Sequence, residues 1–481
     1  MTASFRDPAG VLFPLEGRIL RLVHETGIPD LQAFLASKAA AKFLDSGRVA
    51  RTTVLSEAES LSIRSRPDVH SMLSRGGVDA APRSMLLEHE RVWFPSYPYE
   101  WAPEMLHAAA RLTLDLAREL LADGVGLKDG TPYNVLFRGP EPVFIDLLSF
   151  ERRDPGDSTW LPYAQFVRTF LLPLLATKHF GMALDQILTT RRDGLEPEEV
   201  YRWSKPSQRL RPPFFGLVSM PTWLASGRDQ DDASIYKTRK LDNPEKARFI
   251  LENLLNGLDR ALTRLEPVAG KSTWSSYMVS NNNYSSDHFA AKQGFVEQVM
   301  REYAPKRVAD IGCNTGHFSA IAARSGAQVV ALDYDPVVVG SVWRNARTEK
   351  LPILPLVVNL TRPTPGIGWR NQECSSFLDR ARGGFDAIFM LAVIHHMLVT
   401  ERVPVPDILD LAAELTSDLA VIEFIAPEDS MFKRLTRGRD ELHRGLTTAV
   451  FEAACRRHFE IVRTQHLENT SRWLYLLRKV R

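Results

Sequence analysis

Short apolar runs and helical stretches alternate along the C-terminal part of the chain, from about residue 274 onward. Five apolar runs are predicted as strands of a parallel sheet: 307–309, 329–332, 352–360, 385–391 and 419–424. Helices are predicted between and after them at 317–323, 336–347, 406–416 and 447–458. Two final runs, 459–462 and 473–477, are predicted to close the sheet as an antiparallel pair. This alternation is typical of a Rossmann-like, doubly wound α/β fold.

The N-terminal part carries a different pattern. Residues 11–23 predict a small hairpin that turns at Glu16 and Gly17, and residues 103–121 predict a long helix rich in Ala, Leu, Arg and Glu. Helical patterns continue over residues 163–187. This mixture of strands and helices indicates an α+β domain.

A polar and charged segment, residues 226–242, indicates a loop after this part. Residues 245–265 then predict a connecting helix. We expect three regions: an N-terminal α+β domain at 1–225, a linker with the connecting helix at 226–275, and the α/β domain at 276–481.

A glycine-rich turn joins the first predicted strand to its helix, in the sequence Asp310-Ile311-Gly312-Cys313-Asn314-Thr315-Gly316. Glycines allow a ligand to approach the backbone closely. The second strand ends at Asp333, whose carboxylate can accept hydrogen bonds from both hydroxyls of a ribose. Because the carboxyl ends of parallel strands border one crevice, the pattern predicts a nucleoside-binding site.

The spacing of the turn distinguishes two nucleoside ligands. A dinucleotide site has the pattern G-x-G-x-x-G, with the pyrophosphate at a helix N-terminus, whereas this turn is D-x-G-x-x-x-G. A carboxylate at Asp310 would repel a pyrophosphate but would suit the ammonium of S-adenosylmethionine, which carries no phosphate. The alternative is a Rossmann-like turn that binds another ligand.

The segment from Asp310 to Gly316 resembles motif I of the class I S-adenosylmethionine-dependent methyltransferases, and Asp333 resembles their ribose-binding acid. The resemblance implies a seven-stranded sheet and S-adenosylmethionine as the cofactor, held by Asp310, Gly312, Asn314, Gly316 and Asp333. Many members have a third glycine where this chain has Asn314. Asn tolerates a left-handed backbone better than most residues do, so this departure leaves the interpretation in place.

Four further positions are candidates for contact with the cofactor. Asn359 ends the third strand, where an amide could pair with the adenine edge or only cap a turn. Tyr284 and Lys292 precede the first strand, in a segment that in class I enzymes often folds over the methionine end of the cofactor, where an aromatic ring can contact the sulfonium methyl. The alternative for both is ordinary docking of a helix. Leu391 ends the fourth strand at the same edge.

Two histidines, His395 and His396, follow the fourth strand. Class I methyltransferases place catalytic and substrate-facing groups there, so either histidine could remove a proton from the methyl acceptor. The alternative is that one of them packs against the next helix and only orders the loop. The Asn/Asp-Pro-Pro-Tyr/Phe sequence of enzymes that methylate adenine or glutamine amides is absent at this position, which argues against transfer to an exocyclic amine of adenine or to a glutamine amide.

A second constellation lies in the N-terminal part. Asp129, Asn134 and Asp146 flank strand-like residues, and the segment resembles the catalytic and metal loops of protein-kinase-like folds. That resemblance implies Asp129 as the base, with Asn134 and Asp146 as Mg²⁺ ligands. However, no G-x-G-x-x-G loop precedes Asp129, and no strand supplies an obvious phosphate-binding lysine. The alternatives are a degenerate, pseudokinase-like domain without metal, and an active phosphotransferase.

Composition excludes some classes of function. A net charge of +2 is too small for a nucleic-acid footprint. Three widely separated cysteines match no metal or disulfide framework and suit a reducing, cytoplasmic setting. The sequence shows neither a signal peptide nor an apolar run long enough to span a membrane. We expect a small-molecule acceptor as the partner, without membrane or nucleic acid, and leave a homo-oligomer open.

Nearly the whole chain resembles a bacterial family of class I methyltransferases related to a nodulation-associated protein, through segments such as 96–101, 128–129, 133–135 and 145–146. The resemblance implies a methyltransferase with an N-terminal kinase-like extension. We expect methyl transfer to oxygen or carbon of a small molecule or biosynthetic intermediate, with the N-terminal part shaping the acceptor site or mediating assembly. Two alternatives remain: a bifunctional kinase–methyltransferase, and a non-catalytic S-adenosylmethionine-binding regulator.

Overall fold

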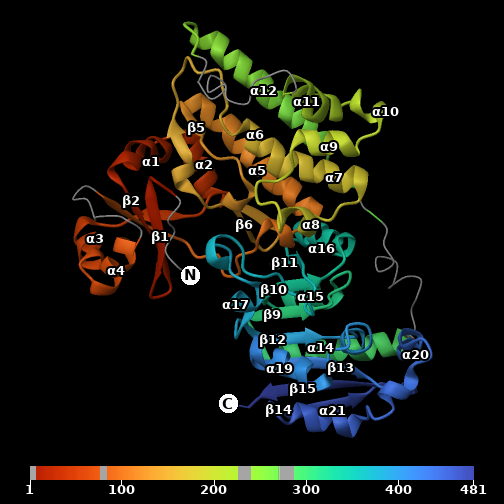
Figure 1. Cartoon of the computed structure of the whole chain (residues 1–481). Helices are drawn as coiled ribbons and strands as arrows, with labels where there is room; N and C mark the ends of the chain where they lie inside the picture. Colours follow the sequence, from red (N-terminus) through yellow and green to blue (C-terminus); the bar gives the residue numbers. More distant parts are fainter. Residues whose placement is uncertain (1–6, 76–83, 226–239, 269, 271–285, 481) are drawn as a thin grey trace.

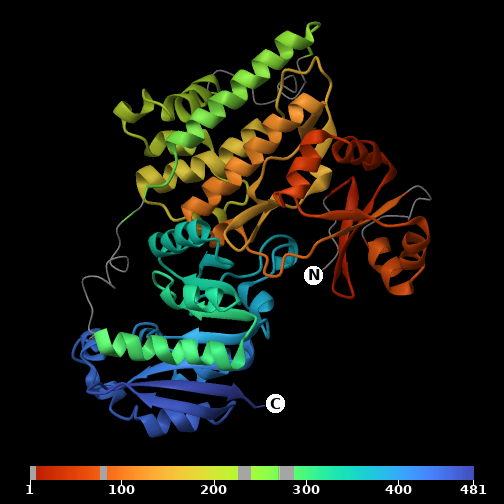
Figure 2. The same ribbon diagram turned by 180° about the vertical axis from the view of Figure 1, so that it is seen from behind.

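A computed structural model describes residues 7–75, 84–225, 240–268, 270 and 286–480. Within these ranges the chain forms a C-terminal α/β part and an N-terminal part that contains a small sheet and a group of helices (Figure 1). The two views place the α/β part below the helical group and to one side of the small sheet (Figure 2).

A seven-stranded sheet forms the centre of the C-terminal part, in the order β11-β10-β9-β12-β13-β15-β14. All neighbouring pairs are parallel except β13–β15 and β14–β15. The strands are β9 (Arg307–Ile311), β10 (Gln328–Asp333), β11 (Ile353–Val357), β12 (Phe385–Met390), β13 (Thr416–Ile425), β14 (Phe459–His466) and β15 (Arg472–Lys479). The predicted strands and the final antiparallel pair are confirmed.

Helices cover both faces of this sheet, so its inner strands are apolar on both sides. Buried residues of α14 and α15 pack on one face, and those of α17, α19 and α21 pack on the other. The helices are α14 (Ser286–Tyr303), α15 (His317–Arg324), α16 (Pro336–Glu349), α17 (Phe377–Ala381), α18 (Ile394–Val399), α19 (Val405–Leu415), α20 (Ser430–Thr436) and α21 (Thr448–Cys455). The predicted Rossmann-like fold class is therefore confirmed.

The small N-terminal sheet is antiparallel, in the order β1-β2-β4-β3. Its first two strands form the predicted hairpin, which turns at Glu16 and Gly17 with φ of 50° and 82°, as a two-residue hairpin turn of the primed type requires. The elements are β1 (Gly10–Leu15), β2 (Arg18–Val23), α1 (Ile28–Leu35), α2 (Lys38–Asp45), β3 (Thr52–Val54), α3 (Glu57–Arg64), α4 (Pro67–Arg75) and β4 (Met85–His89).

The helical group follows, centred on the predicted long helix α5 (Pro103–Glu119). Two short antiparallel pairs come next: β5 (Val125–Leu127) with β8 (Phe150–Arg152), and, between them in the chain, β6 (Val135–Arg138) with β7 (Glu141–Phe144). The remaining helices are α6 (Tyr163–Phe166), α7 (Leu172–Phe180), α8 (Leu184–Leu188), α9 (Pro197–Trp203), α10 (Pro206–Arg209), α11 (Met220–Ala225) and α12 (Pro244–Arg264).

Helix α12 packs along α5. Its buried leucines recur at helical spacing, at Leu251, Leu255, Leu258 and Leu262. Arg111 of α5 also pairs with Asp259 of α12. Amphipathic spacing of this kind forms one apolar stripe on a helix, and here that stripe faces the helical group.

The N-terminal and C-terminal parts share a packed interface. The β6–β7 turn reaches α16, where Trp343 donates its indole N–H to the carbonyl oxygen of Pro140 at 2.9 Å. Glu104 at the start of α5 pairs with Arg344 of α16. Among the described residues, no helix is both long enough and apolar enough to cross a membrane.

Candidate functional site

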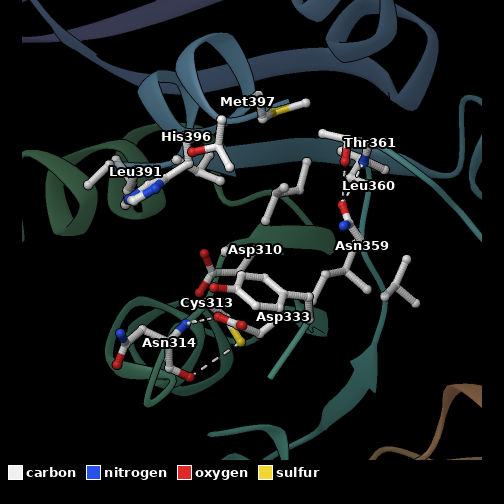
Figure 3. A pocket seen from close by; sticks show the side chains of 18 of the residues that line it. Asp310, Cys313, Asn314, Asp333, Asn359, Leu360, Thr361, Leu391, His396 and Met397 are labelled. Carbon is white, nitrogen blue, oxygen red and sulfur yellow. Dashed lines mark hydrogen bonds between the residues drawn. The ribbon is translucent and has the colours of Figure 1, made fainter. Parts of the chain in front are cut away.

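A cavity of about 560 Å³ opens at the carboxyl edge of the large sheet, beyond the ends of β9, β10, β11 and β12. Its volume lies within the usual range for small-molecule sites. Figure 3 shows Asp310, Cys313 and Asp333 along one side, with Leu391, His396 and Met397 facing them. The strand ends named by the sequence therefore converge on one cavity.

The glycine-rich turn forms the floor of the cavity because its glycines accept conformations and contacts that other residues would not. Gly312 has φ of 72°, and a Cβ atom there would lie 2.9 Å from the side chain of Val393. Gly316 has φ of 81°, and its Cβ would lie 3.0 Å from the side chain of Val342. The turn thus fits closely between the loop after β12 and helix α16.

Asn314 adopts a left-handed backbone conformation, with φ of 49°, which Asn tolerates better than most residues do. Its backbone N–H donates to Oδ2 of Asp333 at 3.0 Å. The backbone N–H of Asp335 donates to Oδ1 of the same carboxylate at 3.1 Å. Asp333 is therefore oriented by two backbone groups while its side chain still borders the cavity, and burial raises its pKa above the ordinary value.

Asp310 lies deeper, and only 2% of it is exposed. The hydroxyl of Ser319 donates to its Oδ2 at 2.6 Å. Burial raises the pKa of Asp310 to about 6, against the lowering effects of Ser319 and of the Lys292 charge. A carboxylate held in this way gains from any cation that enters the cavity beside it.

Lys292 of α14 also borders the cavity but is paired within the protein. Its ammonium lies 2.6 Å from Oε2 of Glu423, which is fully buried on β13, and 4.9 Å from the ring centre of Phe318. Arg472 of β15 lies on the other side of Glu423 and also binds Asp429. This chain of alternating charges fixes the back of the cavity.

Asn359 follows β11 and borders the cavity with its neighbours Val358, Leu360 and Thr361. Its amide oxygen accepts from the backbone N–H of Thr361 at 3.0 Å and from the hydroxyl of Thr361 at 2.6 Å. The amide oxygen is thus used inside the loop, and the NH₂ group is the part that can serve a ligand. Both sequence interpretations of Asn359, a turn cap and a ligand contact, are compatible with this geometry.

The two histidines, His395 and His396, occupy different positions. His396 borders the cavity, and burial lowers its pKa to about 4, so its imidazole is neutral at ordinary pH. His395 is not among the residues that border the cavity; it is buried, and its Nδ1 has no hydrogen-bond partner. Burial, followed by the nearby charges, lowers the pKa of His395 well below the usual range. The structure distinguishes two residues that the sequence left equivalent.

Sequence reasoning missed several residues of this cavity. Ala392, between β12 and α18, has φ of 56°, an uncommon value for a residue with a side chain, and no sequence signal marks it. Arg362 and Glu401 form an ion pair at the rim, with an N–O distance of 3.1 Å. Arg362 and Glu401 were not among the positions predicted from the sequence. Tyr284, a predicted contact, lies outside the described residues.

The N-terminal constellation is also brought together. Asp146 pairs with Arg21 of β2, and the hydroxyl of Ser149 donates to its Oδ2 at 2.6 Å. Asn134 donates from Nδ2 to the Ser149 hydroxyl at 3.0 Å. Although burial alone would raise the pKa of Asp146, its contacts with Arg21 and Ser149 lower it.

Burial, followed by the charge of Asp146, raises the pKa of Asp129. The guanidinium of Arg21 thus compensates the charge of Asp146 within the protein. Among the residues that the structure describes, no group of three or more His, Cys, Asp and Glu side chains is arranged to hold a metal ion.

Comparisons with known proteins agree with the geometry of the C-terminal part. Residues 286–471 match the family model described as a methyltransferase domain. The chain is similar to the nodulation protein NoeA of Rhizobium meliloti (strain 1021), with 28% identity over 480 residues, which cover 99% of this chain and 95% of NoeA.

Two solved structures are also similar to this chain. WbdD matches with 15% identity over 42% of each chain and a TM-score of 0.30, so the match spans less than half of WbdD. The N-methyltransferase NodS from Bradyrhizobium japonicum WM9 matches with 14% identity over 41% of this chain and 99% of its own, with a TM-score of 0.31. These two scores are too low to carry an argument about this chain.

The raised pKa of Asp310 predicts a pH-dependent stability cost. The folded protein binds the Asp310 proton more tightly than the unfolded chain does, so the related stability is present below about pH 4 and is lost as the pH rises through about 6. A difference of about two pKa units corresponds to about 3 kcal/mol. Asp310→Asn should therefore raise the free energy of unfolding at pH 8 by up to about 3 kcal/mol, with a smaller gain at pH 5. Urea titrations at both pH values measure this, and an equal gain at both would contradict it.

The Arg21–Asp146 pair predicts that the N-terminal part does not transfer phosphate. Phosphoryl transfer relies on cations placed around the triphosphate, and here Asp146 is already neutralised by a side chain. Labelled ATP with Mg²⁺ or Mn²⁺ should give no hydrolysis or phosphorylated product above background, with wild type and with Asp146→Ala alike. A product formed by wild type and lost in the variant would establish the bifunctional alternative.

Proposed function

Since the chain is an S-adenosylmethionine-dependent methyltransferase, we propose that it methylates an oxygen or carbon atom of a small molecule or biosynthetic intermediate. The observation that carries the proposal is the arrangement of one cavity, in which Asp310, the glycine-rich turn and Asp333 border one side and His396 faces them (Figure 3). A nucleoside with a cationic end fits the first set of groups, and an acceptor that must lose a proton fits the second.

The residues on the floor suit the parts of S-adenosylmethionine. Asp333 presents a carboxylate to ribose hydroxyls, held in place by the backbone N–H groups of Asn314 and Asp335. Asp310 presents a buried carboxylate to the ammonium of the cofactor, and the NH₂ group of Asn359 is placed for the adenine edge. Gly312 borders the cavity, whereas Gly316 does not and instead lets the turn pack closely against Val342 of α16. Lys292 and Leu391 border the same space.

The cofactor supplies an electrophilic methyl group, which an acceptor takes by direct displacement. The protein therefore contributes mainly alignment and exclusion of water, which account for a large part of the barrier in reactions of this kind. The apolar residues Val358, Leu360, Leu391 and Met397 exclude water around the reacting atoms. The buried charges of Lys292, Glu423 and Arg472 hold the back wall rigid.

We assign the general base to His396. The assignment rests on its position, because it borders the cavity opposite the cofactor groups. Burial lowers its pKa to about 4, so the imidazole is neutral and a weaker base than free histidine. His395, the other candidate from the sequence, lies behind it, with ring centres 4.2 Å apart. We propose that His395 orients His396 by packing. Removal of an acceptor proton suits hydroxyl or activated carbon acceptors, for which deprotonation accompanies methyl transfer.

For the N-terminal part we propose a pseudokinase-like domain over residues 1–225. Residues 226–275 join it to the methyltransferase domain at 276–481, and their helix α12 packs on the N-terminal side, along α5. Its polar trio Asp129, Asn134 and Asp146 supports a structural role, since Arg21 satisfies Asp146. We propose that this domain shapes the methyltransferase site or mediates assembly. The free, buried cysteines Cys313, Cys374 and Cys455 support a reducing, cytoplasmic setting.

The proposed function predicts binding of the cofactor. Calorimetry should show S-adenosylhomocysteine binding in the micromolar range, or roughly −7 to −8 kcal/mol. Asp333→Ala should lose about 1.5–3 kcal/mol of binding free energy, the usual size of hydrogen bonds to a charged group. Asp418→Ala, at an exposed carboxylate on β13, is the matched control and should bind as wild type does. Binding of NAD without binding of S-adenosylhomocysteine would refute the proposal.

The second prediction concerns the base. His396→Ala should cut turnover about 10²–10⁴-fold, the usual contribution of a positioned base, while the affinity for S-adenosylhomocysteine barely changes. Compared with His396→Ala, His395→Ala should reduce turnover less and lower the free energy of unfolding more, because the ring of His395 is buried. Turnover is measured as S-adenosylhomocysteine formed with candidate acceptors. If turnover of His396→Ala equals that of wild type, alignment alone carries the chemistry. If no acceptor supports turnover by wild type, the non-catalytic alternative gains support.

A further inference from the structure

One wall of the cofactor cavity is a long loop, residues 359–376, which we call the wall loop. Its first residues, Asn359 to Arg362, border the cavity. The loop ends at α17, which precedes strand β12 of the sheet. Its backbone is closed on itself by the pairing of Ile367 with Cys374 and by a bond from Phe377 N–H to the Thr364 carbonyl. Figures 1 and 2 both place α17 toward the N-terminal part.

Glu100 of the N-terminal part is the main partner of the wall loop. It is fully buried, and its Oε1 accepts from the hydroxyl of Thr364 and from the guanidinium of Arg380 on α17. Its Oε2 accepts from the backbone N–H of Tyr97 at 3.1 Å. One carboxylate therefore joins the middle of the loop, the helix after the loop and the N-terminal segment 95–101.

Arg380 is enclosed by the N-terminal residues Phe94, Pro95 and Tyr97. Its guanidinium lies 4.8 Å from the ring centre of Tyr97 and 5.2 Å from that of Phe94, and it donates to the carbonyl oxygen of Pro95. Only 4% of its side chain is exposed. A buried guanidinium requires hydrogen-bond acceptors on all sides, and here the N-terminal part supplies two of them.

Two further bonds hold the far end of the wall loop. The backbone N–H of Ser375 donates to the Tyr97 hydroxyl at 3.1 Å. Glu373 pairs with Arg192, which belongs to the helical group. From Thr364 to Arg380, the segment is thus held by N-terminal residues at four points, whereas its first residues face the cofactor.

A second region of the interface offers a contrast. There Glu104, also buried, pairs with Arg344 of α16, and Trp343 bonds to Pro140. These contacts join the two parts of the chain as the Glu100 contacts do. They involve α16 and not the wall loop. A substitution there therefore shows what a weakened interface by itself does to stability and to cofactor binding.

We propose that Glu100 is a positioning residue, through which the N-terminal part holds the wall loop in the conformation that binds the cofactor. The proposal rests on the assignment of the cavity to S-adenosylmethionine and deepens it. When the Glu100 contacts are lost, the loop samples other conformations, and the cofactor must bear the entropic cost of ordering it. Cofactor affinity and the packing of the N-terminal part are thus linked, and linkage acts in both directions.

The test compares Glu100→Gln with Glu104→Gln in the full chain. Both substitutions neutralise a buried carboxylate at the interface and keep its shape, so both should lower the melting temperature. Only Glu100→Gln should weaken S-adenosylhomocysteine binding, by tenfold or more in calorimetry, with turnover at saturating cofactor within about threefold of wild type. A second variant, Thr364→Val, removes one bond of Glu100 from the loop and should weaken binding three- to tenfold with little effect on melting.

Hydrogen exchange of the cofactor-free protein gives a readout that needs no ligand. Peptides that cover residues 359–376 should exchange faster in Glu100→Gln than in wild type, and those of Glu104→Gln should not. Equal losses of affinity in the two glutamine variants, or unchanged exchange of the wall loop in Glu100→Gln, would overturn the proposal. If wild type does not bind S-adenosylhomocysteine, the cofactor assignment fails, while the exchange result still decides whether Glu100 holds the loop.

Discussion

A carboxylate and a guanidinium, Glu100 and Arg380, are removed from water together where the N-terminal and C-terminal parts meet. Removing one partner of such a pair typically costs about 3–5 kcal/mol, since the other charge is left buried without compensation. The pair therefore favours the arrangement of the two parts in which both charges are paired. Because the wall of the cavity is bonded to the same carboxylate through Thr364, the arrangement of the whole chain and the shape of the site are set together.

The cavity itself is built at the expense of stability. Asp310 is buried, and Ser319 and the Lys292 charge compensate the loss of water around it only in part, so its pKa is raised. Ala392 has a backbone conformation unusual for a residue with a side chain. Strain and unmet charge of this kind collect at binding sites, where a ligand compensates them. The network of Lys292, Glu423 and Arg472 behind the cavity has the opposite character, because each charge is matched within the protein. The charges behind the cavity are thus paired within the protein, whereas the buried carboxylate of Asp310 would be stabilised by a bound cation.

The N-terminal polar residues illustrate how one spacing can serve two purposes. The spacing of Asp129, Asn134 and Asp146 resembles that of a phosphotransferase site, and in the fold Asp146 is bonded to Arg21 and Ser149. The guanidinium comes from β2, far away in the sequence, and compensates the charge of Asp146. A constellation of metal-competent side chains can therefore stabilise packing between a sheet and a helical group.

The sequence by itself determined the α/β fold, the positions of its strands along the chain and the turn that borders the cavity. Strand runs are apolar, and Gly312, Asn314 and Asp333 stand at fixed distances along the chain, so local pattern was sufficient. Only the tertiary structure decided which histidine borders the cavity, since His395 and His396 are adjacent and differ only in the direction that α18 gives them. It also decided the partners of Glu100 and Asp146, because Arg380 and Arg21 lie far from them in sequence. Charges that pair over such distances leave no periodic signal, whereas the burial of apolar strands does.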